Sequence, residues 1–265
     1  MLKMIDILNE DVVVPGASVL LKWFANHANY TYVFLDTETT GRGPSSGDQL
    51  TQIGAIATFF NTETLRFAEI DRFNIKIKLN PEMLARVNDE PDRELPDDTE
   101  KLKKMFGYSK KAILKYNHYD LANSESFEEE MDALNKFEDY LDSHGDVILF
   151  IHNATFDLPF VEVNQIFKEK NRIAFDTLDF FRNTFHPILS RLSKTSERHK
   201  TLHAQLIGNN EKKSSSLPDL VKGFNPNPEE YSKKLDMAHE ALTDCENTID
   251  VFQKALLSIY QHLNA

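Results

Sequence analysis

Three short acidic motifs hold the residues of this chain that could do chemistry. The first is Asp36-Thr37-Glu38, which directly follows the apolar run 30–35 (YTYVFL). On a strand, residues i and i+2 project from the same side, so both carboxylates would lie together at the strand end. Two acids held that close repel each other unless a cation lies between them, and hard oxygen ligands favour Mg²⁺ or Mn²⁺. Taken alone, such a triplet is more typical of a solvated strand end.

The second motif is HNATFD, residues 152–157, after the very apolar segment 147–151 (VILFI). A buried strand there would place Asp157 at its carboxyl end, in the loop or first helical turn, where open α/β sheets bind ligands. Asp157 could equally be an ordinary acid at a helix N-terminus, which the helix dipole favours. For His152, a structural hydrogen-bonding role is the more typical one.

The third motif is HEALTDC, residues 239–245, at the start of a predicted final helix. With His239 on the loop before that helix and Asp244 about one turn inside it, both side chains can face one cleft. Acids at helix starts are common, so this motif is also weak alone. The order of the three motifs, two at strand ends and one at a helix start, makes a shared site the better interpretation.

The elements that must position these motifs follow from hydrophobic periodicity. Three strand-like runs, 30–35, 52–60 and 73–79, are joined by short links and predict an antiparallel meander. From residue 126 onward the patterns alternate as helix 126–143, strand 147–151, helix 154–170, strand 173–176 and helix 178–192. A last helix is predicted at 240–262, with its apolar residues inward. The whole pattern predicts an α/β fold with a mixed β-sheet flanked by helices.

Residues 80–125 interrupt this pattern as a charged insertion or lid. Its acidic run 89–100 would repel a phosphate backbone, and a lysine-rich segment follows it. Lysines interleaved with aromatic residues could follow a single strand by charge and stack its bases, so four of them are candidates for substrate binding: Lys103, Lys104, Lys110 and Lys111. A solvated amphipathic helix would explain the segment equally well. Since no Gly/Ser- or Pro-rich linker divides the chain, we predict an N-terminal extension over 1–29 and one domain over 30–265.

In this order, LDTETTG (35–41), HNATFD and HEALTDC resemble the three exonuclease motifs of the DEDDh 3′–5′ exonucleases, the DnaQ-like group within the ribonuclease H-like fold. The resemblance extends over residues 30–265 and is supported by DQLTQIGAI (48–56) and AFDTLDFFR (174–182). The joint match is specific, although each motif alone is not. The chain departs from the small members of that family in the length of the 80–125 insertion.

The resemblance implies a catalytic site with two divalent ions, Mg²⁺ or Mn²⁺, held by four carboxylates: Asp36, Glu38, Asp157 and Asp244. Asp36 would bridge both ions, Glu38 and Asp244 would complete one ion site, and Asp157 would hold the other ion. Neutral His239 would act as the general base that takes a proton from the attacking water. Activity would then fall as the pH drops below about 6.5, the ordinary histidine value. The product would be a nucleoside 5′-monophosphate released from a 3′ end.

Substrate contacts are expected around the first two motifs. By the same resemblance, the small-residue turn formed by Thr37, Thr39, Thr40 and Gly41 would lie against the terminal sugar. Phe156 and the pair Phe180-Phe181 could offer ring faces to bases. The expected partner is the 3′ end of a nucleic acid, with single-stranded DNA favoured over RNA, although an exoribonuclease fits the same motifs. A polymerase partner and a homodimer both stay open.

Composition excludes some classes of protein. With 30 basic and 42 acidic residues the formal charge is −12, which argues against a protein that coats nucleic acid but not against one that grips a few terminal nucleotides. No apolar stretch predicts a membrane span or a secretory signal. A single cysteine excludes a disulfide framework and favours a reducing compartment, so a cytoplasmic location is expected.

Two rival functions belong to other classes. Cys245 could be the nucleophile of a thiol enzyme, although a buried apolar role suits its helical position better. Alternatively, the chain could be a non-catalytic, polymerase-associated binding module. Such a module has no physical need to keep mutually repelling acids, and this disfavours it.

Overall fold

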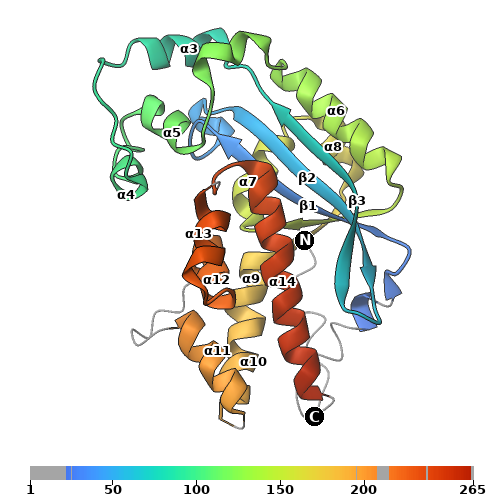
Figure 1. Cartoon of the computed structure of the whole chain (residues 1–265). Coiled ribbons are helices and arrows are strands. Elements are labelled where there is room, and N and C mark those ends of the chain that lie inside the picture. Colours follow the sequence, from blue (N-terminus) through green and yellow to red (C-terminus); the bar gives the residue numbers. More distant parts are fainter. Residues whose placement is uncertain (1–21, 25, 195, 208–214, 237, 264–265) are drawn as a thin grey trace.

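The computed structural model describes residues 22–24, 26–194, 196–207, 215–236 and 238–263. Its strands form one mixed sheet in the order β3-β2-β1-β4-β5 (Figure 1). They are β1 (Thr31–Thr39), β2 (Leu50–Asn61), β3 (Arg66–Lys76), β4 (Val147–Ile151) and β5 (Ile173–Asp176). β1, β2 and β3 are antiparallel, whereas β4 pairs parallel to β1, and β5 parallel to β4. The predicted meander and mixed α/β sheet are therefore confirmed.

β1 is longer than the sequence predicts. The predicted strand-like run ends at residue 35, whereas β1 continues through Asp36 and Glu38 to Thr39. Its pairing with β2 sets Asp36 opposite Gly54 and Glu38 opposite Gln52, and the register shifts only after Glu38. The first acidic pair is thus held by a sheet ladder and not by a mobile turn.

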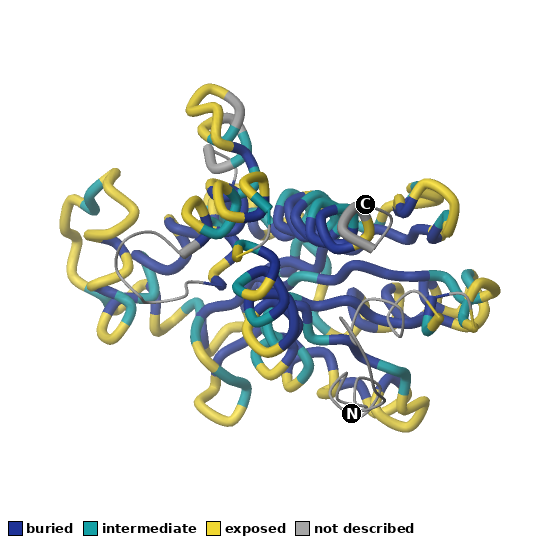
Figure 2. The backbone as a smooth tube through the Cα atoms, turned by 90° about the horizontal axis from the view of Figure 1, so that it is seen from below, coloured by how far each residue is buried: buried dark blue, intermediate teal, exposed yellow. Residues whose placement is uncertain are grey.

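Alternate residues of β1 belong to two separate cores, one on each face of the sheet. Tyr32 and Phe34 lie in the first core, and Val33 and Leu35 lie in the second. The first core is covered by the helices α9 (Thr177–Phe180), α10 (His186–Leu192), α11 (Glu197–Ile207), α12 (Leu217–Phe224) and α14 (Ala241–Leu263). The second is covered by α6 (Glu130–Ser143), α7 (Ala154–Val161) and α8 (Gln165–Lys170). Figure 2 shows both buried layers on either side of the sheet.

Several helices differ from the prediction. The single helix expected over 154–170 is two helices, because the chain breaks after α7 and Asn164 caps α8 by accepting from Ile166 N and Phe167 N. Met131 is apolar but 48 % exposed, since it lies in the first turn of α6 on the solvent side. Helix α13 covers Pro228–Asp236, and a π-helical segment, Phe181–Phe185, joins α9 to α10. Within the predicted N-terminal extension, Phe24 is fully buried in the first core.

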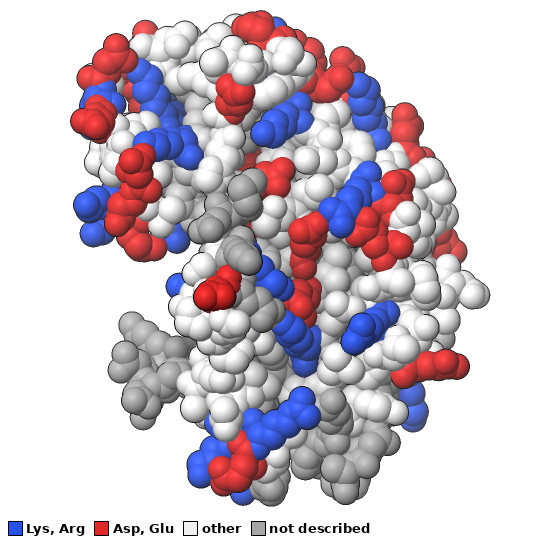
Figure 3. Space-filling model, viewed as in Figure 1, with Lys and Arg blue, Asp and Glu red and all other residues white. Residues whose placement is uncertain are grey.

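The 80–125 insertion is folded, and its charges pair internally. It contains α3 (Pro81–Asn88), α4 (Thr99–Lys103), α5 (Lys110–Tyr116) and a 3₁₀ segment, Leu121–Ser126. Small apolar clusters join α5 to α3 and to α4. The acidic run folds back onto the lysines, with Lys111 Nζ 3.1 Å from Asp92 and Lys115 Nζ 2.7 Å from Asp97. Figure 3 shows basic and acidic side chains intermixed over this part of the surface.

Among the residues that the structure describes, no helix combines the length and the apolar character needed to cross a membrane.

Candidate active site

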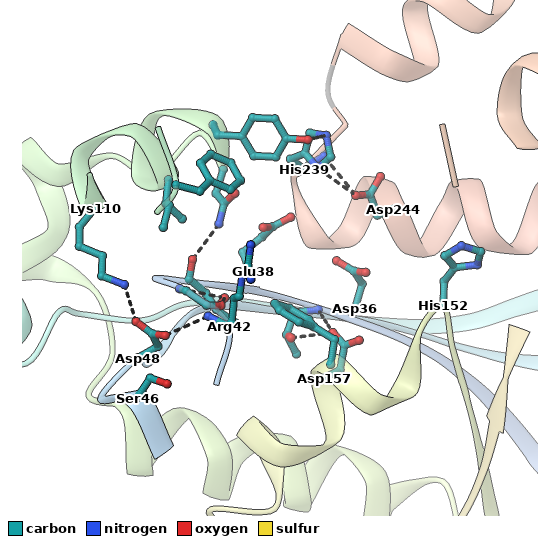
Figure 4. A pocket seen from close by; sticks show the side chains of 18 of the residues that line it. Asp36, Glu38, Arg42, Ser46, Asp48, Lys110, His152, Asp157, His239 and Asp244 are labelled. Carbon is teal, nitrogen blue, oxygen red and sulfur yellow. Dashed lines mark hydrogen bonds and ion pairs between the residues drawn. The ribbon is translucent and has the colours of Figure 1, made fainter. Parts of the chain in front are cut away.

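All five residues proposed for catalysis line one cavity of about 650 Å³ (Figure 4). They come from three segments far apart in the chain: Asp36 and Glu38 from β1, Asp157 from α7, and His239 and Asp244 from the start of α14. Glu38, Asp157 and Asp244 are buried, and Asp36 is half-buried. The fold therefore brings together every residue of the predicted catalytic set.

Asp157 is positioned by a sharp turn after β4. Asn153 adopts a left-handed backbone conformation with φ 78°, and the carboxylate of Asp176 accepts from Asn153 N at 3.2 Å and Ala154 N at 3.1 Å. This turn places the first turn of α7 beside the end of β1. There, Asp157 Oδ1 accepts hydrogen bonds from Thr37 N at 2.9 Å and Thr37 Oγ1 at 2.6 Å. Thr37, expected at the terminal sugar, thus also orients a candidate metal ligand.

The start of α14 is tied to β2 by very close packing. A Cβ on Gly54 would lie 2.5 Å from Leu242 N, so only glycine lets the helix approach this near. Gln52 Oε1 accepts from Ala241 N at 3.3 Å. The backbone N–H of His239, itself in the left-handed region with φ 70°, donates to Asp244 Oδ2 at 3.1 Å. Both residues of the third motif are therefore fixed relative to the sheet.

The four buried or half-buried acids of the cavity all have raised pKa values. Burial raises the pKa of Asp36, and repulsion from Asp157, Asp244 and Glu38 raises it further. Burial and the same acidic neighbourhood also raise the pKa of Glu38. Burial is the main cause that raises the pKa of Asp157 to about 7 and that of Asp244 to about 6. The pKa of His239 falls to about 4, because burial and nearby Lys103 disfavour the imidazolium.

This set of side chains suits a hard divalent cation. Glu38, His239 and Asp244 each offer a ligand atom, and these atoms lie within 4.8 Å of one another. Carboxylate oxygens are the ligands that Mg²⁺ and Mn²⁺ prefer, and a cation would remove the repulsion that raises the carboxylate pKa values. Asp36 and Asp157 line the same cavity, and Asp36 lies between Asp244 and Asp157 in the view of Figure 4. The residues present therefore fit the metal that the motifs imply.

The insertion supplies a wall of the cavity that the sequence did not predict. Helix α5 places Tyr116 against His239, with ring centroids 3.9 Å apart and a hydrogen bond between the phenol oxygen and His239 Nε2. Burial raises the pKa of Tyr116, so its phenol stays neutral. At the other end of the cavity, Lys110 Nζ donates to Asp48 Oδ1 at 2.5 Å and to the carbonyl oxygen of Thr40 at 2.8 Å.

The predicted substrate residues separate into two groups. Those that line the cavity are Thr37, Thr39, Gly41, Phe156 and Lys110. Thr40 is buried. Lys103, at the end of α4, and Lys104, just after it, are exposed, and Lys111 binds the acidic run. The suggestion that Phe180 and Phe181 stack on bases is wrong, because both are fully buried in the first core.

Two further expectations concern single residues. His152 lines the cavity, but its Nδ1 contacts Thr177 Oγ1 and its Nε2 contacts Ser215 O, both at 3.0 Å, which supports the structural role. Cys245 is 1 % exposed, its thiol donates to Gly54 O, and burial raises its pKa. A buried neutral thiol is a poor nucleophile, so the thiol-enzyme hypothesis is contradicted.

The polar residues of the site that the sequence did not predict either line the cavity or, as Gln52 does, hold one of its segments: Arg42, Asp48, Gln52, Tyr116 and Asn117. Asp48 and Gln52 lie inside the segment 48–56 that supported the resemblance, so a signal for them existed. The sequence pattern marks Tyr116 only as one of the aromatic residues that alternate with lysines in the insertion. Its contact with His239 joins residues 123 positions apart, for which a single sequence carries no local sign.

Comparisons with known proteins agree on the fold. No protein-family model matches the chain, and no curated protein does. Among solved structures, the chain is similar to the zinc-bound complex of E. coli exonuclease I with single-stranded DNA, with a TM-score of 0.51 and 18 % identity over 88 % of this chain and 42 % of that chain. E. coli exonuclease I with a dA16 oligonucleotide gives a TM-score of 0.51 and 16 % identity, over 88 % and 43 % of the two chains.

The chain thus spans less than half the length of the exonuclease I structures that it resembles. At this identity the likeness concerns the fold. Together with the strand order, it confirms the predicted ribonuclease H-like α/β fold class, a mixed sheet flanked by helices, over 88 % of this chain.

Proposed function

We propose that this chain is a divalent-metal-dependent 3′–5′ exonuclease that acts on single-stranded DNA and releases nucleoside 5′-monophosphates. One observation carries the proposal: four carboxylates and a neutral imidazole from β1, α7 and α14 converge in one cavity. The shared fold supports it, because the exonuclease I structures of the same fold were solved with single-stranded DNA and with an oligonucleotide.

The four carboxylates would hold the cations, with Asp36 shared between two ions, Glu38 and Asp244 completing one ion site and Asp157 the other. Bound divalent ions supply charge stabilisation for the attacking and leaving oxygens of an in-line phosphoryl displacement. Asp157 is kept in place by its two bonds from Thr37. Loss of protons from these buried acids is the event that prepares the site, since each has a raised pKa.

His239 is proposed as the general base. Its pKa of about 4 keeps the imidazole neutral at pH 7, so one ring nitrogen can accept a proton from the attacking water. His239 Nδ1 lies 4.0 Å from Asp244 Oδ2, so the imidazole ring lies beside the cluster of four carboxylates. General base catalysis of this kind contributes about 10²- to 10⁴-fold to a rate.

The other end of the cavity is proposed to bind the terminal nucleotide. The turn that contains Thr39 and Gly41 forms part of its lining, and Phe156 adds a ring face. Arg42 is exposed at the rim, so its positive charge is available for a phosphate group, whereas Lys110 lies deeper and is paired with Asp48. Lys111 is already paired with the acidic run, which argues against substrate binding by the whole lysine segment.

The test is a degradation panel of matched 5′-labelled DNA and RNA strands, single and duplex, with Mg²⁺, Mn²⁺ or excess EDTA. We expect a ladder that shortens from the 3′ end of single-stranded DNA with either metal, and none with EDTA. Asp36→Ala should abolish the ladder. Full activity in EDTA or in Asp36→Ala would overturn the metal mechanism, degradation of RNA alone would indicate an exoribonuclease, and binding without cleavage would indicate a non-catalytic module.

A further inference from the structure

Helix α5 of the insertion is bound firmly to the end of β1. Asn117 Nδ2 donates to the carbonyl oxygen of Thr39 at 3.0 Å, and both residues are buried. Lys110 Nζ donates to the carbonyl oxygen of Thr40 at the first turn of the helix. Apolar residues of α5 are also buried in the clusters shared with α3 and α4. These contacts at both ends of α5 make it a fixed wall of the cavity.

This wall holds the ring of Tyr116 in one place. Phe106 packs against it edge-on, with centroids 5.0 Å apart, and Lys103 Nζ lies 5.4 Å from its centroid. Tyr116 in turn covers the ring of His239, at 3.9 Å between centroids and 31° between planes. The phenol oxygen meets His239 Nε2, whereas Nδ1 points toward Asp244 (Figure 4).

The backbone of His239 is fixed by its own N–H bond to Asp244, but that bond does not orient the side chain. In the described part of the chain, the hydrogen bond to the imidazole comes from the insertion. A histidine tautomer is set by the hydrogen bond that one ring nitrogen makes, which leaves the other nitrogen for chemistry.

We propose that Tyr116 is a positioning residue for His239: its phenol oxygen accepts the Nε2 proton, which fixes the imidazole as the Nε2–H tautomer and leaves the Nδ1 lone pair facing the carboxylates. The effect of Tyr116 on rate rests on the proposed exonuclease function, whereas its effect on the tautomer does not. The insertion then takes part in the chemistry, in addition to any role in substrate grip.

The first test is independent of activity. The metal-free full chain is labelled with ¹⁵N-histidine, and the ring signals of His239 are identified by their loss in His239→Gln. Wild type should show the Nε2–H tautomer, and Tyr116→Phe should shift the His239 nitrogen signals while Tyr119→Phe leaves them unchanged. Tyr119 is the matched control, because it donates to Ile77 O at 3.0 Å from the same insertion. An Nδ1–H tautomer in wild type, or identical spectra for wild type and Tyr116→Phe, would overturn the proposal.

The second test is kinetic. Loss of one hydrogen bond to the base should lower kcat of Tyr116→Phe about 3- to 10-fold with KM unchanged, and Tyr119→Phe should behave as wild type. In a His239→Gln background Tyr116→Phe should cost nothing more, since both changes then act on one group. The positioning role is refuted if Tyr116→Phe raises kcat, or if it lowers kcat as much in the His239→Gln background as in wild type. If wild type hydrolyses nothing, the proposed function fails, and the spectra still decide the role of Tyr116.

Discussion

Replacing Asp157 with asparagine should stabilise the metal-free protein while it abolishes hydrolysis. Asp157 is 2 % exposed, and its pKa is raised to about 7, chiefly by burial. Its Oδ1 accepts from Thr37 N and Thr37 Oγ1, and the amide oxygen of asparagine can accept the same two bonds. The substitution therefore removes a buried charge and keeps the local geometry.

The magnitude follows from the difference between the folded and unfolded pKa values of Asp157. Between pH 4 and pH 7 the unfolded chain has lost this proton and the folded chain has kept it, so the free energy of unfolding falls as the pH rises. At 1.36 kcal/mol per pKa unit, the destabilisation reaches about 4 kcal/mol at pH 8 and only about 2 kcal/mol at pH 5. Asp157→Asn removes it, which raises the melting temperature by about 10 °C at pH 8.

The assay is thermal and urea unfolding of both proteins in EDTA at pH 8 and pH 5. Asp250→Asn is the matched control, because burial would raise the pKa of Asp250 but its bonds to Lys234 and Lys254 outweigh this and lower it, so asparagine should destabilise there. With Mn²⁺ at a hundredfold excess over Kd, wild type gains about 2.7 kcal/mol, so the stability advantage of Asp157→Asn at pH 8 should shrink from about 4 to about 1 kcal/mol. If Asp157→Asn were less stable than wild type in EDTA at pH 8, or gained equally at both pH values, the reasoning would be refuted.

Three further predictions follow from the site and its supports. The acid limb of the pH–rate profile should lie near pH 6–7, because Asp157 and Asp244 have pKa values of about 7 and 6 whereas His239, with a pKa of about 4, stays neutral. It should move to lower pH as the Mn²⁺ concentration is raised, because protons and metal compete for the carboxylates. A limb independent of metal concentration would contradict this. His239→Gln should lower kcat about 10²- to 10⁴-fold. It should keep the Mn²⁺-induced rise in melting temperature, because the carboxylates remain and the glutamine amide oxygen can replace the imidazole nitrogen as a ligand, whereas Asp244→Ala should lose both, as activity assays and thermal unfolding would show. Gly54→Ala should lower the free energy of unfolding by about 1–3 kcal/mol in denaturant, because its Cβ would meet Leu242 N at 2.5 Å. Gly107→Ala, whose Cβ would have nothing within 4 Å, should leave the stability unchanged. Equal stability of the two variants would argue against close packing at Gly54.

The sequence predicted the parts of the fold that depend on local patterns. Strands β4 and β5 have the predicted bounds, because a short apolar run between polar turns leaves little choice. β1 extends beyond the apolar run 30–35, because ladder bonds to β2 keep the polar Asp36 and Glu38 in the strand. The catalytic set was predictable because the three motifs occur together in the order that the resemblance requires, although each motif is weak alone.

What could not be predicted depends on contacts between distant segments. The chain turns back after the acidic run 89–100 and pairs this run with the lysines that follow it, as Lys111 with Asp92 shows. Local charge patterns cannot show such a reversal. In the same way, no pattern near Tyr116 or His239 indicates that one ring covers the other.

The distribution of the site along the chain has a consequence for biosynthesis. Thr37 and Asp157, which meet through two hydrogen bonds, are 120 residues apart, and Asp244 lies later still, in α14. A polypeptide emerging from the ribosome lacks the last carboxylate and His239 until α14 has been made and has packed on β2. Synthesis would therefore withhold any nuclease activity until the two cores have closed, and nearby messenger RNA would meet only an inert nascent chain.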